Sequence, residues 1–153
     1  MKDKTFLSEL KQLSGCIYKN NNNKKPSNWI LVSKEKNKKT GFYAETYAKN
    51  KNIIIVFRGT DMDKGKTEKF KDLSSDIMMD LFKLPPAQII NAMNYYKKIR
   101  KDFENYNIMF TGHSLGGSLA QILGAQYGNE TYTFNAYGTA NLIKYQVKNF
   151  DNI

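Results

Sequence analysis

Three segments of the chain place apolar residues at the spacing of one helix face. The first begins at Phe6 and ends near Gly15, the second covers residues 87–103, and the third covers residues 114–127. A further helix is expected over residues 140–150. Each of these segments is long enough to bury an apolar stripe against another element, so the pattern predicts a helix in each.

Five shorter segments have the length and the β-branched or aromatic content of strands. They cover residues 29–33, 42–48, 52–58, 107–111 and 131–135. The third of them, NIIIVFR, is continuously apolar, which is typical of a strand buried on both faces. From this strand onward strands alternate with helices, which implies parallel pairing with right-handed crossovers. The predicted fold is therefore α/β, with a mostly parallel central sheet flanked by helices.

The composition agrees with one folded domain over residues 1–153. The chain is 41% hydrophobic and 13% aromatic, which is enough for one core. It contains a single cysteine, Cys16, and a single histidine, which excludes an internal disulfide framework and a cysteine-rich zinc site, so no metal or cofactor is expected. We find no secretory signal and no apolar run near the ~18 residues that cross a membrane, which leaves a cytoplasmic location by default.

The net charge of +10 is concentrated near the N-terminus, because residues 1–51 carry +8. Two interpretations are open: a plain solvated surface, or attraction to an anionic membrane surface. Arginine, which binds phosphate in a forked geometry, occurs only at Arg58 and Arg100. With so few arginines and no known nucleic-acid-binding module, we do not expect nucleic acid as a partner.

The candidate chemistry lies in the five residues Gly112, His113, Ser114, Leu115 and Gly116, which spell G-x-S-x-G. They follow a predicted strand and open a predicted helix, which is the setting of a nucleophile elbow. Such an elbow holds its serine in a strained turn, and the two glycines let strand and helix pass closely. The alternative is a glycine-rich helix cap on an ordinary strand.

An acyl-transfer site also needs N–H or O–H donors for the developing oxyanion. The backbone N–H of Leu115, directly after the serine, is one candidate. Thr60 is the second, because it ends the buried strand over residues 52–58 at the same edge of a parallel sheet. From its position alone, Thr60 could equally be an ordinary cap between strand and loop.

Three ordered motifs resemble the class 3 (fungal-type) lipase family of the α/β-hydrolase superfamily. They are IVFRGT at residues 55–60, TGHSLGGSLAQ at 111–121 and TFNAYG at 133–138. The resemblance implies hydrolysis of an acylglycerol, a phospholipid or another carboxylic ester, so the substrate would be a lipid or small ester. It implies Ser114 as nucleophile and Thr60 and Leu115 as the oxyanion hole. It also implies that the Asp76 carboxylate fixes the hydroxyl of the oxyanion residue.

The resemblance leaves the catalytic triad incomplete. In this family the acid and the histidine follow the nucleophile, whereas the single histidine, His113, directly precedes Ser114. Consecutive residues in a tight turn point their side chains apart, so we expect His113 to support the elbow. We expect a domain truncated before the strand and loop that carry the acid and the histidine.

Two accounts of the missing base stay open. In the first, the chain is the N-terminal part of a longer lipase and a complementing C-terminal segment supplies the base. In the second, it is a catalytically inactive remnant, a binding module that docks on anionic lipid surfaces.

Overall fold

The computed structural model describes residues 3–18, 25–59 and 86–136, which contain three helices and one five-stranded sheet. The helices are α1 (Lys4–Cys16), α4 (Pro86–Asp102) and α5 (Leu115–Tyr127). The strands are β1 (Ile30–Lys36), β2 (Tyr43–Lys49), β3 (Asn52–Phe57), β4 (Asn107–His113) and β5 (Thr131–Phe134). Each lies within a few residues of its predicted position. The predictions for Thr60, for Asp76 and for residues 140–150 lie outside the described residues.

The sheet is mixed, and its strand order is β1-β2-β3-β4-β5. The parallel pairing predicted from the alternation of strands and helices is present for β3–β4 and β4–β5. The pairs β1–β2 and β2–β3 are antiparallel. Only two residues separate β2 from β3, too few for a parallel crossover, and Asn50 in this turn takes a positive φ of 55°. The α/β fold class is therefore confirmed, with an antiparallel half before its parallel half.

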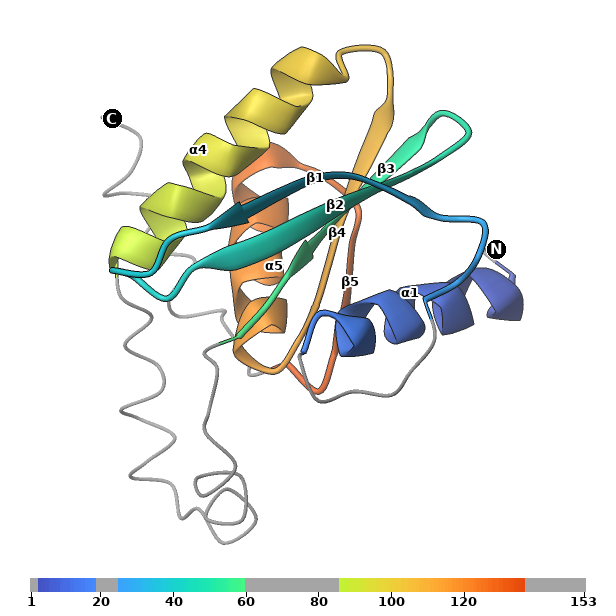
Figure 1. Cartoon of the computed structure of the whole chain (residues 1–153), viewed down its shortest axis with the longest axis horizontal. Helices are drawn as coiled ribbons and strands as arrows, with labels where there is room; N and C mark the ends of the chain where they lie inside the picture. Colours follow the sequence, from blue (N-terminus) through green and yellow to red (C-terminus); the bar gives the residue numbers. More distant parts are fainter. Residues whose placement is uncertain (1–2, 19–24, 60–85, 137–153) are drawn as a thin grey trace, which may run out of the picture.

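Helices cover both faces of the sheet, with α1 on one face and α4 and α5 on the other (Figure 1). Successive residues of β3 alternate between the two sides. Ile53, Ile55 and Phe57 pack with α4 and α5, whereas Ile54 and Val56 pack with α1. All five of these side chains are fully buried. The prediction that this strand is buried on both faces is confirmed.

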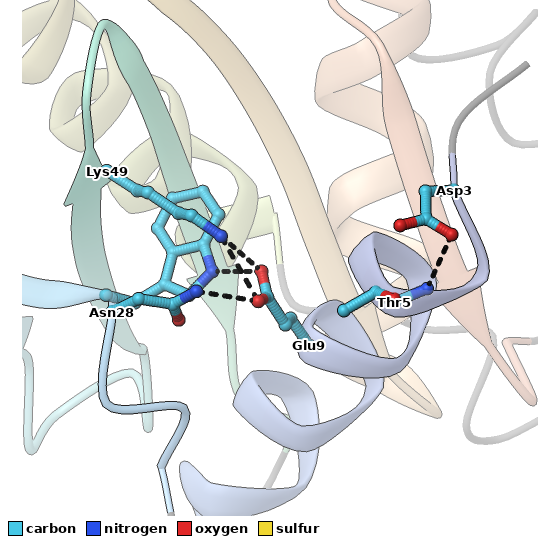
Figure 2. Close-up of polar contacts among 6 residues, drawn as sticks. Asp3, Thr5, Glu9, Asn28 and Lys49 are labelled. Atoms are coloured by element: carbon cyan, nitrogen blue, oxygen red, sulfur yellow. Dashed lines mark hydrogen bonds and ion pairs between the residues drawn. The ribbon is translucent and has the colours of Figure 1, made fainter.

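A cluster of polar contacts ties α1 to the sheet (Figure 2). The carboxylate of Glu9 accepts hydrogen bonds from Asn28 Nδ2 and Trp29 Nε1, both at 2.8 Å, and from Lys49 Nζ at 2.9 Å. Burial acts to raise the pKa of Glu9, but the hydrogen bonds from these three residues and the Lys49 charge hold that pKa below its ordinary value. Glu9 therefore fixes α1 against the β1–β2 edge of the sheet.

Candidate active site

Ser114 lies between the end of β4 and the start of α5, in the strand–turn–helix setting that its motif predicts. Its backbone has φ 54° and ψ −125°, an unfavourable conformation for a residue with a side chain. Two hydrogen bonds hold this turn: Ser114 N–H donates to the Phe134 carbonyl, and Ser118 N–H donates to the Ser114 carbonyl, both at 3.1 Å. The fold thus keeps a half-buried serine in a strained turn at the C-terminal end of an interior strand, β4.

The two glycines of the motif lie where backbone meets backbone. A Cβ on Gly112 would overlap the Gly116 carbonyl and lie 2.7 Å from the nitrogen of Gly117. A Cβ on Gly116 would overlap the carbonyl of Phe57 and lie 2.9 Å from the nitrogen of Gly59. A side chain at either position would push α5 away from the strand ends. The missing side chains therefore let the first turn of α5 lie directly on the end of β3.

One candidate oxyanion donor, the backbone N–H of Leu115, lies at this junction. Leu115 is the first residue of α5, where backbone N–H groups have no partner within the helix. The position of a Cβ on Gly59 is 3.2 Å from Leu115 Cβ and 3.3 Å from Gly116 N, so the backbone after β3 lies against the start of the helix. Thr60 follows Gly59 directly but, like Asp76, lies outside the described residues.

Tyr18, which the sequence analysis did not single out, connects both parts of the site. Its hydroxyl accepts a hydrogen bond from Gly59 N–H and donates one to the His113 carbonyl, both at 3.2 Å. These partners are 41 and 95 residues away along the chain, so no local pattern marks Tyr18 as part of the site. The tyrosine lies two residues beyond the end of α1 and connects that helix to the elbow.

His113 packs its ring edge-on against the ring of Tyr18, with centroids 6.2 Å apart and an interplanar angle of 87°. Burial lowers the pKa of His113, because it disfavours the charged imidazolium form. Its backbone pairs with Phe134 in the β4–β5 register. The geometry thus gives His113 a packing role beside the elbow.

Within residues 3–18, 25–59 and 86–136, no three or more His, Cys, Asp or Glu side chains gather into a group that could hold a metal ion. Over the same ranges, every helix is too short or too polar to cross a bilayer.

The mixed sheet and the strained serine before α5 define the class of protein: the fold is that of a lipase-like α/β hydrolase. The chain superposes on the lipase of Rhizopus microsporus var. chinensis with a TM-score of 0.59, at 15% identity, over 95% of this chain and 62% of that one. It superposes on a triacylglycerol lipase of Penicillium expansum with a TM-score of 0.58, at 20% identity, over 86% of this chain and 60% of that one.

The particular family follows from the sequence. The family model described as phospholipase-like, the Tle-like phospholipase domain, matches residues 10–149, and the chain belongs to this family. A protein of Vanderwaltozyma polyspora provisionally named lipase ATG15 is 43% identical over 47 residues, which are 31% of this chain and 8% of that protein. The predicted resemblance to class 3 lipases is confirmed.

The matched proteins are longer than this chain. It spans 62% of the Rhizopus microsporus lipase and less than a tenth of the Vanderwaltozyma polyspora protein. Fold and family together support a hydrolase of lipase or esterase type.

Proposed function

We propose that this chain carries the nucleophile and the oxyanion hole of a phospholipid carboxylic-ester hydrolase. The observation that carries the proposal is the strained conformation of Ser114 (φ 54°) between β4 and α5. A serine has no structural need for this conformation, and such strain is found where a reactive group must be presented. Membership of a phospholipase-like family favours a phospholipid as the substrate over other carboxylic esters.

In the proposed reaction, Ser114 Oγ attacks the ester carbonyl carbon and loses its proton to a general base. The carbonyl oxygen becomes an oxyanion, which accepts hydrogen bonds from the N–H of Leu115 and from Thr60. Collapse of this intermediate breaks the carbon–oxygen bond to the lysophospholipid, which leaves with the proton. Water then attacks the acyl-Ser114 ester, releases the fatty acid and restores the serine.

We propose that the general base comes from outside these 153 residues, from a complementing C-terminal segment or a partner chain. The only histidine in the sequence is His113, and its ring packs against Tyr18. When a triad member is removed from a serine hydrolase, the oxyanion hole and binding still give a residual enhancement of about 10³–10⁴-fold over water. The chain by itself is therefore expected to be a slow enzyme.

A docking role on anionic lipid is the second candidate, and the edge strand β1 favours it. Ile30, Leu31 and Val32 are exposed there by 68%, 40% and 41%, and the exposed Lys34 and Lys36 follow on the same strand. Apolar side chains beside lysines suit the surface of an anionic membrane. Electrostatic binding to an anionic membrane weakens as salt screens the charges. Co-sedimentation with phosphatidylserine vesicles that does not change with salt concentration or lipid charge would therefore count against this role.

The test of the hydrolase is release of fatty acid from a short-chain phosphatidylcholine, measured for the intact chain and for Ser114→Ala. The proposal predicts slow turnover that the variant lacks. Ser118→Ala is the matched control, because Ser118 lies on α5 one turn beyond the nucleophile and is buried. Equal rates for the wild-type chain and Ser114→Ala would contradict the proposal.

A further inference from the structure

The hydroxyl of Tyr18 lies between the ends of two neighbouring parallel strands. The register of β3 and β4 closes with the pair Phe57–Gly112. Beyond this pair the strands diverge, because β3 continues into Gly59 and β4 turns into the elbow at Ser114. Backbone groups that leave a ladder inside a protein need other partners. The Tyr18 hydroxyl is such a partner for both strands: it accepts from Gly59 N–H and donates to the His113 carbonyl.

Tyr18 is itself held in place by α1. Leu13 and Ile17, just before it, are buried in the core between α1 and the sheet. Ser14 on the same helix is hydrogen-bonded to Thr111 of β4 at 2.9 Å. The Tyr18 ring lies edge-on against His113. The hydroxyl is therefore at a fixed position relative to β4, and through its bond to Gly59 it fixes the end of β3 as well.

We propose that Tyr18 is a positioning residue of the oxyanion hole. Its hydroxyl sets the spacing between Gly59, which directly precedes Thr60, and the start of α5 at Leu115. This inference rests on the proposed function, in which Thr60 and Leu115 bind one oxyanion together. Two donors can both hydrogen-bond one oxyanion only when their positions are fixed to within about 0.5 Å. Tyr18 acts through Gly59 and not on the substrate.

The test compares Tyr18→Phe with Tyr96→Phe. Tyr96 is the matched control because its hydroxyl also donates a hydrogen bond, at 3.1 Å to Asn129 Oδ1, at the start of β5 and so at the opposite end of the sheet. Both changes remove one oxygen atom and keep the ring. The first measurement is hydrogen exchange of the Gly59 amide by NMR. We expect faster exchange in Tyr18→Phe and unchanged exchange in Tyr96→Phe.

The second measurement is the rate at which a fluorophosphonate labels Ser114, because the phosphoryl oxygen of the adduct occupies the oxyanion site. Tyr18→Phe is expected to label about tenfold more slowly than wild type, since small misplacements of catalytic groups have effects of this order. The ³¹P chemical shift of the adduct should also change. Tyr96→Phe should label at the wild-type rate. Thermal unfolding of both variants measures the stability that each has lost, so the control shows whether a loss of stability alone slows labelling.

The outcomes separate this inference from the proposed function. A wild-type chain that is not labelled at Ser114 overturns the proposed function and, with it, the positioning role. A labelled wild type whose Tyr18→Phe variant reacts at the same rate, with the same ³¹P shift, overturns the positioning role alone. Unchanged exchange of the Gly59 amide in Tyr18→Phe overturns the hydroxyl bridge itself.

Discussion

Ser14 Oγ on α1 lies 2.9 Å from Thr111 Oγ1 on β4, and both side chains are buried. Thr111 Oγ1 donates to the carbonyl of Tyr132 at 2.7 Å, so Ser14 is the donor in the pair of hydroxyls. One chain of hydrogen bonds thus joins α1, β4 and β5, directly below the elbow. It connects the docking of the N-terminal helix to the strand that carries the nucleophile.

The first prediction concerns this chain of hydrogen bonds. Thr111→Val keeps the shape of the side chain but leaves the buried Ser14 hydroxyl without its acceptor and removes one hydrogen bond to the Tyr132 carbonyl. The free energy of unfolding should fall by about 2 kcal/mol, the usual effect of stranding buried polar groups. Ser14→Ala removes only the terminal donor and should lower it by about 1 kcal/mol. Urea unfolding measures both, and equal stability of Thr111→Val and wild type would contradict the assignment.

The second prediction concerns the contact between α5 and β3. Gly116→Ala places a Cβ on the Phe57 carbonyl, so the helix must move. We expect a loss of about 3 kcal/mol, at the upper end of overpacking effects. Gly128→Ala is the control: its Cβ would have open space, but φ is +70° there. That variant should lose only about 1 kcal/mol. A Gly116→Ala variant as stable as Gly128→Ala would show that the close approach is absent.

The third prediction concerns Glu9, whose pKa in the folded chain lies below its ordinary value. A lowered pKa means that the ionised carboxylate stabilises the fold above the unfolded pKa, and that this stabilisation disappears as pH falls through the folded pKa. Wild type should therefore be more stable than Glu9→Gln near neutral pH, and the difference should shrink in acid.

Urea unfolding of both proteins from about pH 7 to about pH 3 covers this window, since free glutamate titrates near 4.3. Glu104→Gln is the control because the side chain of Glu104 is exposed, and its stability should follow that of the wild type at every pH. A difference between Glu9→Gln and wild type that stays constant with pH would refute the role assigned to the Glu9 carboxylate.

The fourth prediction separates packing from catalysis at His113. His113→Phe keeps a ring against Tyr18 and removes both nitrogen atoms. Because a general base contributes about 10²–10⁴-fold, a packing role predicts a fluorophosphonate labelling rate of Ser114 within about twofold of the wild type. A loss as complete as in Ser114→Ala would make His113 the base and overturn the proposal that the base lies outside these residues.

Elements whose pattern is local were predicted from the sequence. The apolar run Asn52–Phe57 and the G-x-S-x-G turn at Ser114 can each be recognised from a few neighbouring residues in the sequence. The order of elements then predicted the parallel half of the sheet.

Contacts between distant parts of the chain could not be predicted in this way. Tyr18 meets Gly59 and His113 only after α1 has packed on the sheet. Glu9 is 20 residues from Trp29 and 40 from Lys49, and it is one of many charged residues on an amphipathic helix. Nothing local distinguishes either side chain, because its partners are brought near only by the fold.

The central claim, that Ser114 is a nucleophile presented by the fold, is tested most directly by fluorophosphonate labelling of the intact chain with the adduct located by peptide mass spectrometry. The account predicts slow labelling confined to Ser114, absent from Ser114→Ala and abolished when the chain is unfolded in urea. Labelling of Ser114 no faster in the folded chain than in the unfolded one would contradict it.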